Sequence, residues 1–357
     1  MIKKECFTAE WIEQVSSELH YNDKNLIEKV IRALSLLEML VKAGCPLVFK
    51  GGTALMLILG KSAHRLSIDI DLICPPGTNI EDYLKSSADF GFINLELVER
   101  KQRDDADIPK SHSKFFYQIA YRNDTDAQSY ILLDVLYEDI HYFRTQQIAI
   151  NCPFIRLEGK PLMVTVPSAE DILGDKLTAF APNTTGIPYY KNGRSCSMEI
   201  AKQLYDVGRL FENVSDLQIT KEAFRKIAVV ELSYRSFGTD IGQVFNDIRQ
   251  TALCISTRGK AGEGDFDLIQ DGIIRVKSFM YKQRYLIDHA IIDAARAAYL
   301  ATLIEKGINE IESYSNNPAD IKDMVIRPSL PNKLNKLRSN LPEAYYYWAK
   351  TSELLEA

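Results

Sequence analysis

The sequence predicts an α+β fold in two parts, a mixed α/β part followed by a mainly helical one. Up to about residue 165, short apolar segments with the two-residue alternation of strands lie between helical patterns. After Pro167 the apolar residues mostly recur at the spacing of helices. At roughly 100–200 residues per domain, the 357 residues suggest two domains. We therefore expect domains at 1–165 and 166–357.

The first part alternates helices and strands. A helix is predicted at 23–43, where apolar residues recur at helical spacing, Asn22 or Asp23 can cap the start and Gly44 ends it. A turn is expected at 122–124, between the last two strands. The remaining predicted elements are a buried strand at 46–49, a helix at 53–59, and strands at 66–73, 92–98, 115–121 and 130–137.

The second part is predicted to be mainly helical. Two linkers interrupt it, at 182–195 and at 257–264, and the second linker contains three glycines. The predicted helices lie at 168–180, 198–211, 221–234 and 240–254, with a longer helical stretch at 266–306 that allows one break.

Composition excludes several classes of protein. The net charge of -5 and the pI near 5.7 argue against a general nucleic-acid coat protein, although a local basic patch is still allowed. The six cysteines are scattered without a CxxC pair, which argues against a zinc site or a disulfide framework and fits a reducing cytosol. The longest mostly apolar stretch, 46–60, is too short to span a bilayer. We expect a cytoplasmic protein without membrane association.

The strongest chemical signal joins a glycine turn to two aspartates. Asp69 and Asp71 alternate with apolar residues, so both carboxylates should lie on one strand face, roughly 7 Å apart. Their repulsion would be relieved by a divalent metal such as Mg²⁺. Gly51 and Gly52 before a helix would let the backbone approach a polyphosphate, and Thr53 could add a hydroxyl. The alternative is a plain turn followed by an edge strand with solvated aspartates.

Three further charged residues have two interpretations each. Asp134, inside an apolar strand, is either a third metal ligand or a paired acid near the strand end. Lys176, on the apolar stripe of its helix, either extends outward to solvent or contacts phosphate. Asp206 follows Lys202 by four residues, which favours a surface ion pair, although its apolar neighbours suggest partial burial.

Four motifs together resemble the AbiEii-type nucleotidyltransferase toxins of type IV toxin–antitoxin and abortive-infection systems. They occur in the order of that family, and one departure is Gln203, where the family commonly has aspartate. The motifs are GGTAL at 51–55, RLSIDIDL at 65–72, DILGDKLTA at 171–179 and KQLYDV at 202–207. The resemblance implies a DNA-polymerase-β-like nucleotidyltransferase domain with a mixed sheet, followed by a mainly helical C-terminal domain.

The resemblance also implies roles for individual residues. Asp69 and Asp71 would bind metal, with Asp134 as a third carboxylate. Lys176 would contact the triphosphate, and Asp206 would be required in the active site, in place of the surface-pair interpretation. With the glycine turn, the expected catalytic and nucleotide-binding residues are Gly51, Gly52, Thr53, Asp69, Asp71, Asp134, Lys176 and Asp206.

The implied reaction transfers a nucleoside monophosphate from an NTP to an acceptor with the help of Mg²⁺ or Mn²⁺. Members of the family are known or proposed to modify RNA, notably the tRNA acceptor end, and each is encoded beside an antitoxin. We therefore expect an RNA acceptor, the tRNA 3′ end, and a cognate antitoxin as partners. Two alternatives remain: transfer to a protein or small molecule, or a non-catalytic protein that binds nucleotide or RNA.

Two segments are candidate RNA contacts. The linker residues 187–194 offer two tyrosines for stacking and two cations for phosphate, which single-stranded ends require. A second basic segment could hold the body of the RNA. Its cations are Arg327, Lys333, Lys336 and Arg338.

Overall fold

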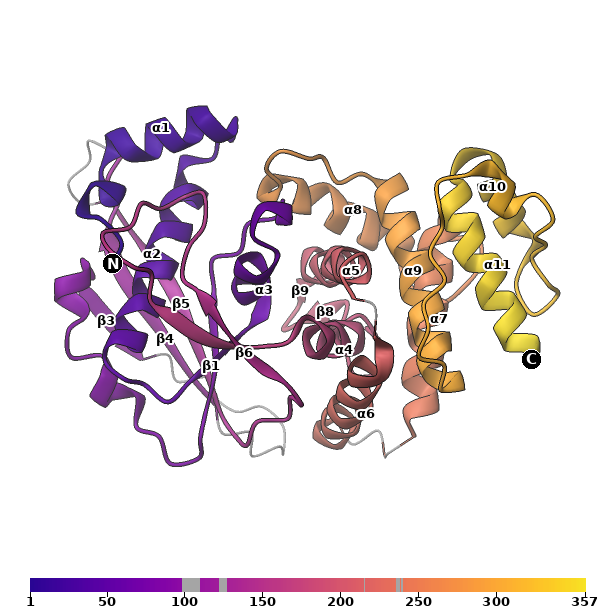
Figure 1. Ribbon diagram of the computed structural model, residues 1–357, viewed down its shortest axis with the longest axis horizontal. Coiled ribbons are helices and arrows are strands. Elements are labelled where there is room, and N and C mark those ends of the chain that lie inside the picture. Colours follow the sequence, from indigo (N-terminus) through magenta and orange to yellow (C-terminus); the bar gives the residue numbers. More distant parts are fainter. Residues whose placement is uncertain (98–109, 122–126, 215, 236–237, 239) are drawn as a thin grey trace. The chain divides into compact units, whose positions relative to one another are not determined.

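The computed structural model divides the chain into two compact units (Figure 1). One unit consists of Met1–Ser168 and Ser278–Arg284, and the other of Ala169–Lys277 and Tyr285–Ala357. The turn expected at 122–124 lies outside the described residues. The structure describes residues 1–97, 110–121, 127–214, 216–235, 238 and 240–357.

The first unit is built on a mixed sheet that has, within the described residues, the strand order β1-β2-β5-β4-β3. The central strands β2 and β5 run parallel, and the other neighbouring pairs are antiparallel. The predicted mixed sheet is therefore confirmed. The strands are β1 (Val48–Lys50), β2 (Ile70–Cys74), β3 (Asn94–Leu97), β4 (Lys110–Gln118) and β5 (Gln128–Tyr137).

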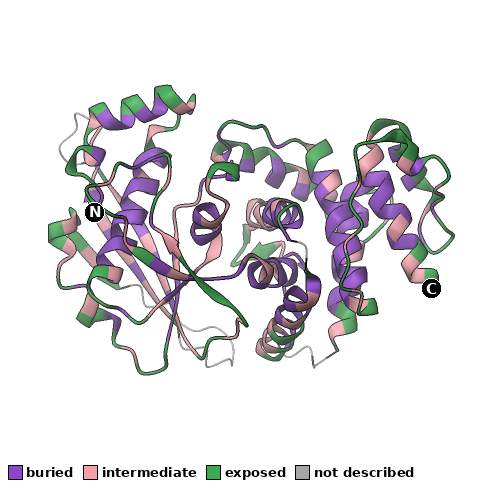
Figure 2. Ribbon diagram, in the orientation of Figure 1, coloured by how far each residue is buried: buried purple, intermediate pink, exposed green. Residues whose placement is uncertain are grey.

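The two central strands bury one face and leave the other partly open. Helix α2 (Lys24–Lys42) packs on these strands, and its apolar side chains join theirs in one core. Most of α2 is buried (Figure 2). The strand residues that belong to this core are Ile70, Leu72, Leu133 and Val135. Asp71 and Asp134 are each offset by one residue from this set, so they lie on the opposite face. The amphipathic pattern at 23–43 is thus confirmed as the helix that covers the core face.

Shorter elements complete the first unit. Helix α3 (Gly51–Leu59) follows β1 directly, two residues before the predicted start. Helix α1 (Ala9–Leu19) and the antiparallel pair β6 (Thr145–Ala149) and β7 (Met163–Pro167) had no prediction. The strands β6 and β7 are short and only partly buried, and for that reason their apolar signal is weak.

Two strands differ from their predicted bounds for physical reasons. Strand β2 begins at Ile70 rather than at residue 66, because the residues before it pair with the returning segment Ser278–Arg284. The amide of Leu66 donates to the carbonyl of Phe279 over 2.8 Å, for example. Strand β4 begins at Lys110, five residues before its predicted start, because its polar first half is held by pairing with β5 rather than by an apolar pattern.

The second unit is mainly helical, as the sequence predicts. Helix α5 packs against α4, α8 and α9, and buried residues line α9 along most of its length (Figure 2). The helices are α4 (Ala169–Ala179), α5 (Ser197–Phe211), α6 (Leu217–Tyr234), α7 (Ile241–Ser256), α8 (Phe266–Val276), α9 (Ile287–Lys306), α10 (Leu337–Asn340) and α11 (Pro342–Glu356).

Three features of this unit add to the prediction. The stretch at 266–306 is broken once, between α8 and α9. The linker at 182–195 contains a small hairpin of β8 (Tyr190–Lys191) and β9 (Arg194–Ser195). Helix α11 was not predicted. Within the described part of both units, no helix is long and apolar enough to cross a membrane.

Candidate active site

The first turn of α3 lies against the carboxylate of Asp71. Strands β1 and β2 pair so that Lys50 is opposite Asp71, and α3 starts at the next residue, Gly51. A Cβ atom at Gly51 would lie 2.0 Å from Oδ2 of Asp71, and the backbone there has a φ of 79°. Only glycine combines this conformation with room for the carboxylate. The glycine motif and the aspartate motif therefore meet in space.

The next two residues of the glycine motif also contact the aspartate motif. A Cβ atom at Gly52 would lie 2.7 Å from Oγ of Ser67 and 2.9 Å from Nη2 of Arg65. Thr53 is buried, and its hydroxyl donates to the backbone carbonyl of Asp69 over 2.7 Å. The proton of Thr53 is therefore used to hold the segment before β2. A direct contact between Thr53 and phosphate stays a prediction.

Asp134 lies beside Asp71 on the same face of the sheet. The two residues are register partners in the parallel pair β2–β5, and neighbouring strands are about 4.8 Å apart. The side chain of Asp134 is 34% exposed, and its Oδ1 lies 2.5 Å from Nδ1 of His112. Asp134 is therefore paired with a histidine, and its role as a third metal ligand stays a prediction.

His112 is a residue that sequence reasoning missed. It lies opposite Asp134 in the pairing of β4 with β5. The available signal was the alternation of β4: the buried residues Ser113 and Phe115, extended backwards, place His112 on the face of the aspartates. The strand was predicted to start at 115, which left His112 outside it.

The donor chemistry of this face suits a divalent cation. Carboxylate oxygens from two adjacent strands are the hard ligands that Mg²⁺ and Mn²⁺ prefer. Among the described residues, however, no group of three or more His, Cys, Asp or Glu side chains is arranged to hold a metal ion. Asp71 and Asp134 offer ligand atoms of the right kind, and metal binding by Asp69, Asp71 and Asp134 stays a prediction.

In the second unit, α4 and α5 bring Lys176 and Asp206 together. The Nζ of Lys176 lies 3.1 Å from Oδ2 of Asp206 and donates to Oε1 of Gln203 over 3.0 Å. The two charged side chains are only 10% and 2% exposed. Lys176 therefore does not extend outward to solvent, and Asp206 is not part of a surface ion pair. Gln203 and Asp206 reach the same lysine because they are three residues apart on one helix.

Two residues further along, α5 is fixed to α9 by a buried carboxylate. A Cβ atom at Gly208 would lie 2.0 Å from Oδ1 of Asp293. Arg209 and Arg296 each approach this oxygen to 3.3 Å, and the hydroxyl of Tyr285 donates to the other oxygen over 3.0 Å. Burial raises the pKa of Asp293, although the two arginines oppose this shift. This network therefore holds the helix that carries Asp206.

The proposed stacking residues differ in exposure. Tyr190 is 58% exposed in the β8–β9 hairpin, and the adjacent cations Lys191 and Arg194 are exposed as well. The hydroxyl of Tyr189 instead lies close to Gly264, and burial raises its pKa to about 12. The expectation of two free rings is therefore corrected to one, Tyr190.

Most cations of the second basic segment have partners within the chain. Arg327 lies 3.5 Å from Glu356, and Lys333 donates to the carbonyl of Lys260. Arg338 donates to the carbonyl of Ile321 over 3.0 Å. Since three of its four cations make such contacts, this segment is less available to RNA than the sequence suggests.

Comparisons with known proteins agree with the motifs. The family described as "Nucleotidyl transferase AbiEii toxin, Type IV TA system" matches residues 34–319. The chain is similar to the crystal structure of JHP933 from Helicobacter pylori, with 15% identity, 86% of this chain and 95% of that chain covered, and a TM-score of 0.40. It is also similar to MenT4, a nucleotidyltransferase toxin from Mycobacterium tuberculosis H37Rv, with 12% identity, 82% and 89% covered, and a TM-score of 0.46.

The comparison with curated proteins returned no match. The family match alone spans well over half of the chain and includes all four motifs. This chain belongs to the AbiEii family of nucleotidyltransferase toxins of type IV toxin–antitoxin systems.

Proposed function

We propose that this toxin transfers a nucleoside monophosphate from an NTP to RNA, with the 3′ end of tRNA as the acceptor, in a metal-dependent reaction in the cytoplasm. The observation that carries this proposal is the contact between the Asp71 carboxylate and the first turn of α3 at Gly51. A carboxylate, which can bind a metal ion, thereby lies beside the N-terminus of a helix, which can bind phosphate. A cognate antitoxin follows from the family.

The chain's own residues have distinct roles in this reaction. Asp69, Asp71 and Asp134 would hold a divalent cation, which when bound neutralises the triphosphate. The free N–H groups at the start of α3 would bind phosphate oxygens and orient the chain of phosphates for in-line attack. Asp134, which His112 orients, would favour loss of the proton from the attacking hydroxyl.

Lys176 and Asp206 have roles that the family resemblance supplies. Lys176 would contact the triphosphate as a compact point charge. Its approach to Asp206 and Gln203 fixes the position of its ammonium group. Asp206 would thus act through Lys176, by compensating its charge in a nearly closed environment.

The reaction is tested with each α-labelled NTP, with and without cellular RNA, on gels for RNA and for protein. Wild type should label RNA, and Asp69→Ala or Asp71→Ala should label nothing. Both variants should keep the wild-type circular dichroism, with an unchanged or slightly higher melting temperature, because a carboxylate repulsion is removed. Full activity of either variant, or activity in excess EDTA, would rule out the metal mechanism.

The acceptor needs a separate experiment. Wild type and Asp69→Ala are expressed in bacteria, and tRNA 3′ ends are sequenced when growth stops. Extended tRNA in cells arrested by wild type alone would support the proposal. Unextended tRNA would favour a protein or small-molecule acceptor. The net charge of -5 and the contacts that the second basic segment makes within the chain also favour such an acceptor. Equal arrest by both forms would separate toxicity from nucleotide transfer.

A further inference from the structure

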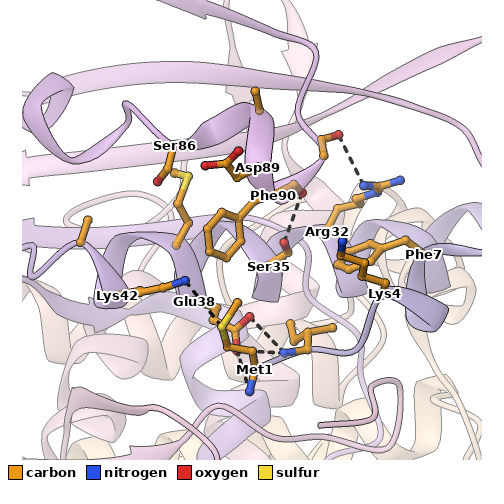
Figure 3. Close-up of a pocket in the computed structure, with 15 residues that line it drawn as sticks. Met1, Lys4, Phe7, Arg32, Ser35, Glu38, Lys42, Ser86, Asp89 and Phe90 are labelled. Atoms are coloured by element: carbon orange, nitrogen blue, oxygen red, sulfur yellow. Dashed lines mark hydrogen bonds and ion pairs between the residues drawn. The ribbon is translucent and has the colours of Figure 1, made fainter. Parts of the chain in front are cut away.

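A cavity of about 580 Å³ lies in the first unit, away from the aspartates (Figure 3). Three segments line it: α2, the short turn η4 (Ser87–Phe90), and the N-terminal residues up to η1 (Lys4–Phe7). Cavities that bind small molecules have volumes of about 300–1,000 Å³. Since α2 covers the sheet face opposite to Asp71 and Asp134, a ligand here would not touch those residues.

The lining is rich in cations and aromatic rings. Lys4, Arg32 and Lys42 line the cavity together with Phe7 and Phe90. Figure 3 shows Arg32 beside Phe7 and Lys4 on one side of Phe90, and Lys42 on the other side. One end of the cavity therefore has two cationic residues, and its middle is aromatic.

The acids of the lining do not cancel these charges. Glu38 is buried, and both of its carboxylate oxygens accept the backbone N–H of Ile2, over 3.0 and 3.1 Å. Asp89 is exposed on η4. Neither acid has an ion pair with Arg32 or Lys4 among the described residues. Arg32 itself pairs with the buried Glu28 over 3.5 Å, outside the lining, so Lys4 is the cation of this end that has no ion pair among the described residues.

Arg32 is buried with poor hydrogen bonding. Its guanidinium carbon lies 4.7 Å from the ring centre of Phe7 and 4.9 Å from that of Tyr117. Along its edge, the contacts to Glu28 and to the carbonyl of Gly91 are both 3.5 Å long, and Nε has no hydrogen-bond partner in the described part of the chain. The side chain is only 8% exposed. Such a group is normally satisfied by good partners.

We propose that this cavity binds a small molecule in which one anionic group, a carboxylate or phosphate, is joined to an aromatic or apolar body. The anionic group would lie at the Arg32 end and complete the bonding of the guanidinium edge, with Lys4 as a second cation. The body would pack against Phe7, Phe90 and Met39. Two oxygens of a carboxylate or of a phosphate can accept from the fork of an arginine together, which explains the choice of ligand class.

The test is calorimetric titration of the full chain with phenyl phosphate and with benzoate. Inorganic phosphate and benzyl alcohol serve as the separate halves of the ligand. At least one joined probe should bind at submillimolar to millimolar concentration and raise the melting temperature. Each half should bind roughly tenfold more weakly or worse, because it makes only one set of contacts. No binding of either joined probe at 10 mM, a concentration of the order of the weakest useful affinities, would overturn the proposal.

Two lysines that are adjacent in sequence provide the matched variants. Lys4→Met should weaken binding roughly tenfold, since a charged hydrogen bond is lost. Lys3→Met should leave it unchanged, because Lys3 pairs with Glu5 and does not line the cavity. Equal affinities of both variants would contradict the assignment. Phe90→Ala should weaken the joined probes and leave inorganic phosphate unaffected.

Arg32 is tested by Arg32→Lys, because removal of its charge would leave Glu28 buried without its partner and endanger folding. This variant should fold and lose most of the affinity for the joined probe, since an ammonium does not reproduce the fork. Unchanged affinity would mean that Arg32 only supports the fold. Asp71→Ala should bind the probe like wild type, so failure of the proposed transfer reaction and failure of this site are distinguishable.

Discussion

The carboxylates of the sheet and those of the helices have different environments. Asp134 on β5 is one-third exposed and contacts the ring of His112. Asp206 on α5 is nearly closed off and paired with Lys176. Asp293 on α9 is completely buried between two arginines and a tyrosine. The comparison teaches that the more an acid of this chain is buried, the more its charge is compensated by neighbouring cations: Asp134 keeps solvent access, whereas Asp293 is enclosed by its partners.

A large loss of transfer is expected at the glycine that faces Asp71. Gly51→Ala would place a methyl group 2.0 Å from Oδ2 of Asp71, in a backbone conformation that alanine disfavours by roughly 1–2 kcal/mol. The carboxylate must move to make room, and displacement of an active-site group by about 1 Å costs on the order of 100-fold in rate. We expect transfer of labelled NMP to fall by at least about 100-fold, together with a lower free energy of unfolding.

Gly44→Ala is the matched control for this variant. Gly44 has nearly the same backbone angle, a φ of 76°, and no atom lies within 4 Å of the position of a new Cβ. The control should lose about 1 kcal/mol of stability and keep its transfer rate. If both variants lose activity equally, backbone strain rather than the Asp71 contact is responsible.

The next effect tests whether Lys176 only neutralises Asp206. Lys176→Met should lower the free energy of unfolding by about 3–5 kcal/mol, because it leaves a buried carboxylate without its cation. The double variant Lys176→Met/Asp206→Asn should regain most of this stability in urea unfolding, since no charge is then buried. Transfer should remain absent in both, because the triphosphate has lost its lysine. Lys176→Arg should restore transfer poorly, since a planar fork does not match the space of an ammonium.

Recovery of transfer in the double variant would contradict this role. Lys176 would then be a structural counter-charge, comparable to the arginines around Asp293. The measurement therefore decides whether Asp206 takes part in transfer, as proposed for the acids of the sheet, or only stabilises the fold, like Asp293 on α9.

Much of the architecture could be predicted from sequence, because long apolar patterns determine it. The helix at 24–42 and the helices α4 to α9 were found for this reason. The pair β6–β7 and helix α11 were missed, because their burial depends on partners remote in sequence rather than on a local period. The start of β2 was misplaced for a similar reason. The residues just before β2 pair with the remote segment 278–284 and do not extend the strand.

The candidate site shows the same limit. The spacing of Asp69 and Asp71 was visible in the sequence, and so were the glycines at 51 and 52. Their contact across Gly51 required the β1–β2 register, which spacing alone does not contain. The partner of Asp134 was also hidden, because it depends on which residue of β4 lies opposite. The exposure of Tyr189 and Tyr190 likewise depends on the fold of the hairpin.

The smallest effect is expected for His112. Its contact with the carboxylate is what distinguishes Asp134 from an acid that is surrounded only by water. His112→Ala should remove the bond to Oδ1 and let the carboxylate rotate, with a loss of transfer of roughly tenfold, at the lower end of what such supporting residues cost. His112→Asn can still offer an N–H group and should recover part of the rate. The melting temperature should change little, because Asp134 is partly exposed and the desolvation cost is small.

His141 provides the control that makes this result interpretable. It is half-buried and pairs more loosely with Glu138 over 3.8 Å, so His141→Ala removes a histidine near a carboxylate that is none of the three aspartates. Its transfer rate should stay at the wild-type level. If His112→Ala also keeps the full rate, Asp134 needs no orientation and its environment is set by solvent. If His112→Ala abolishes transfer as completely as Asp71→Ala does, the histidine acts directly on the reactants, and the open face of the sheet holds one functional group more than the sequence predicts.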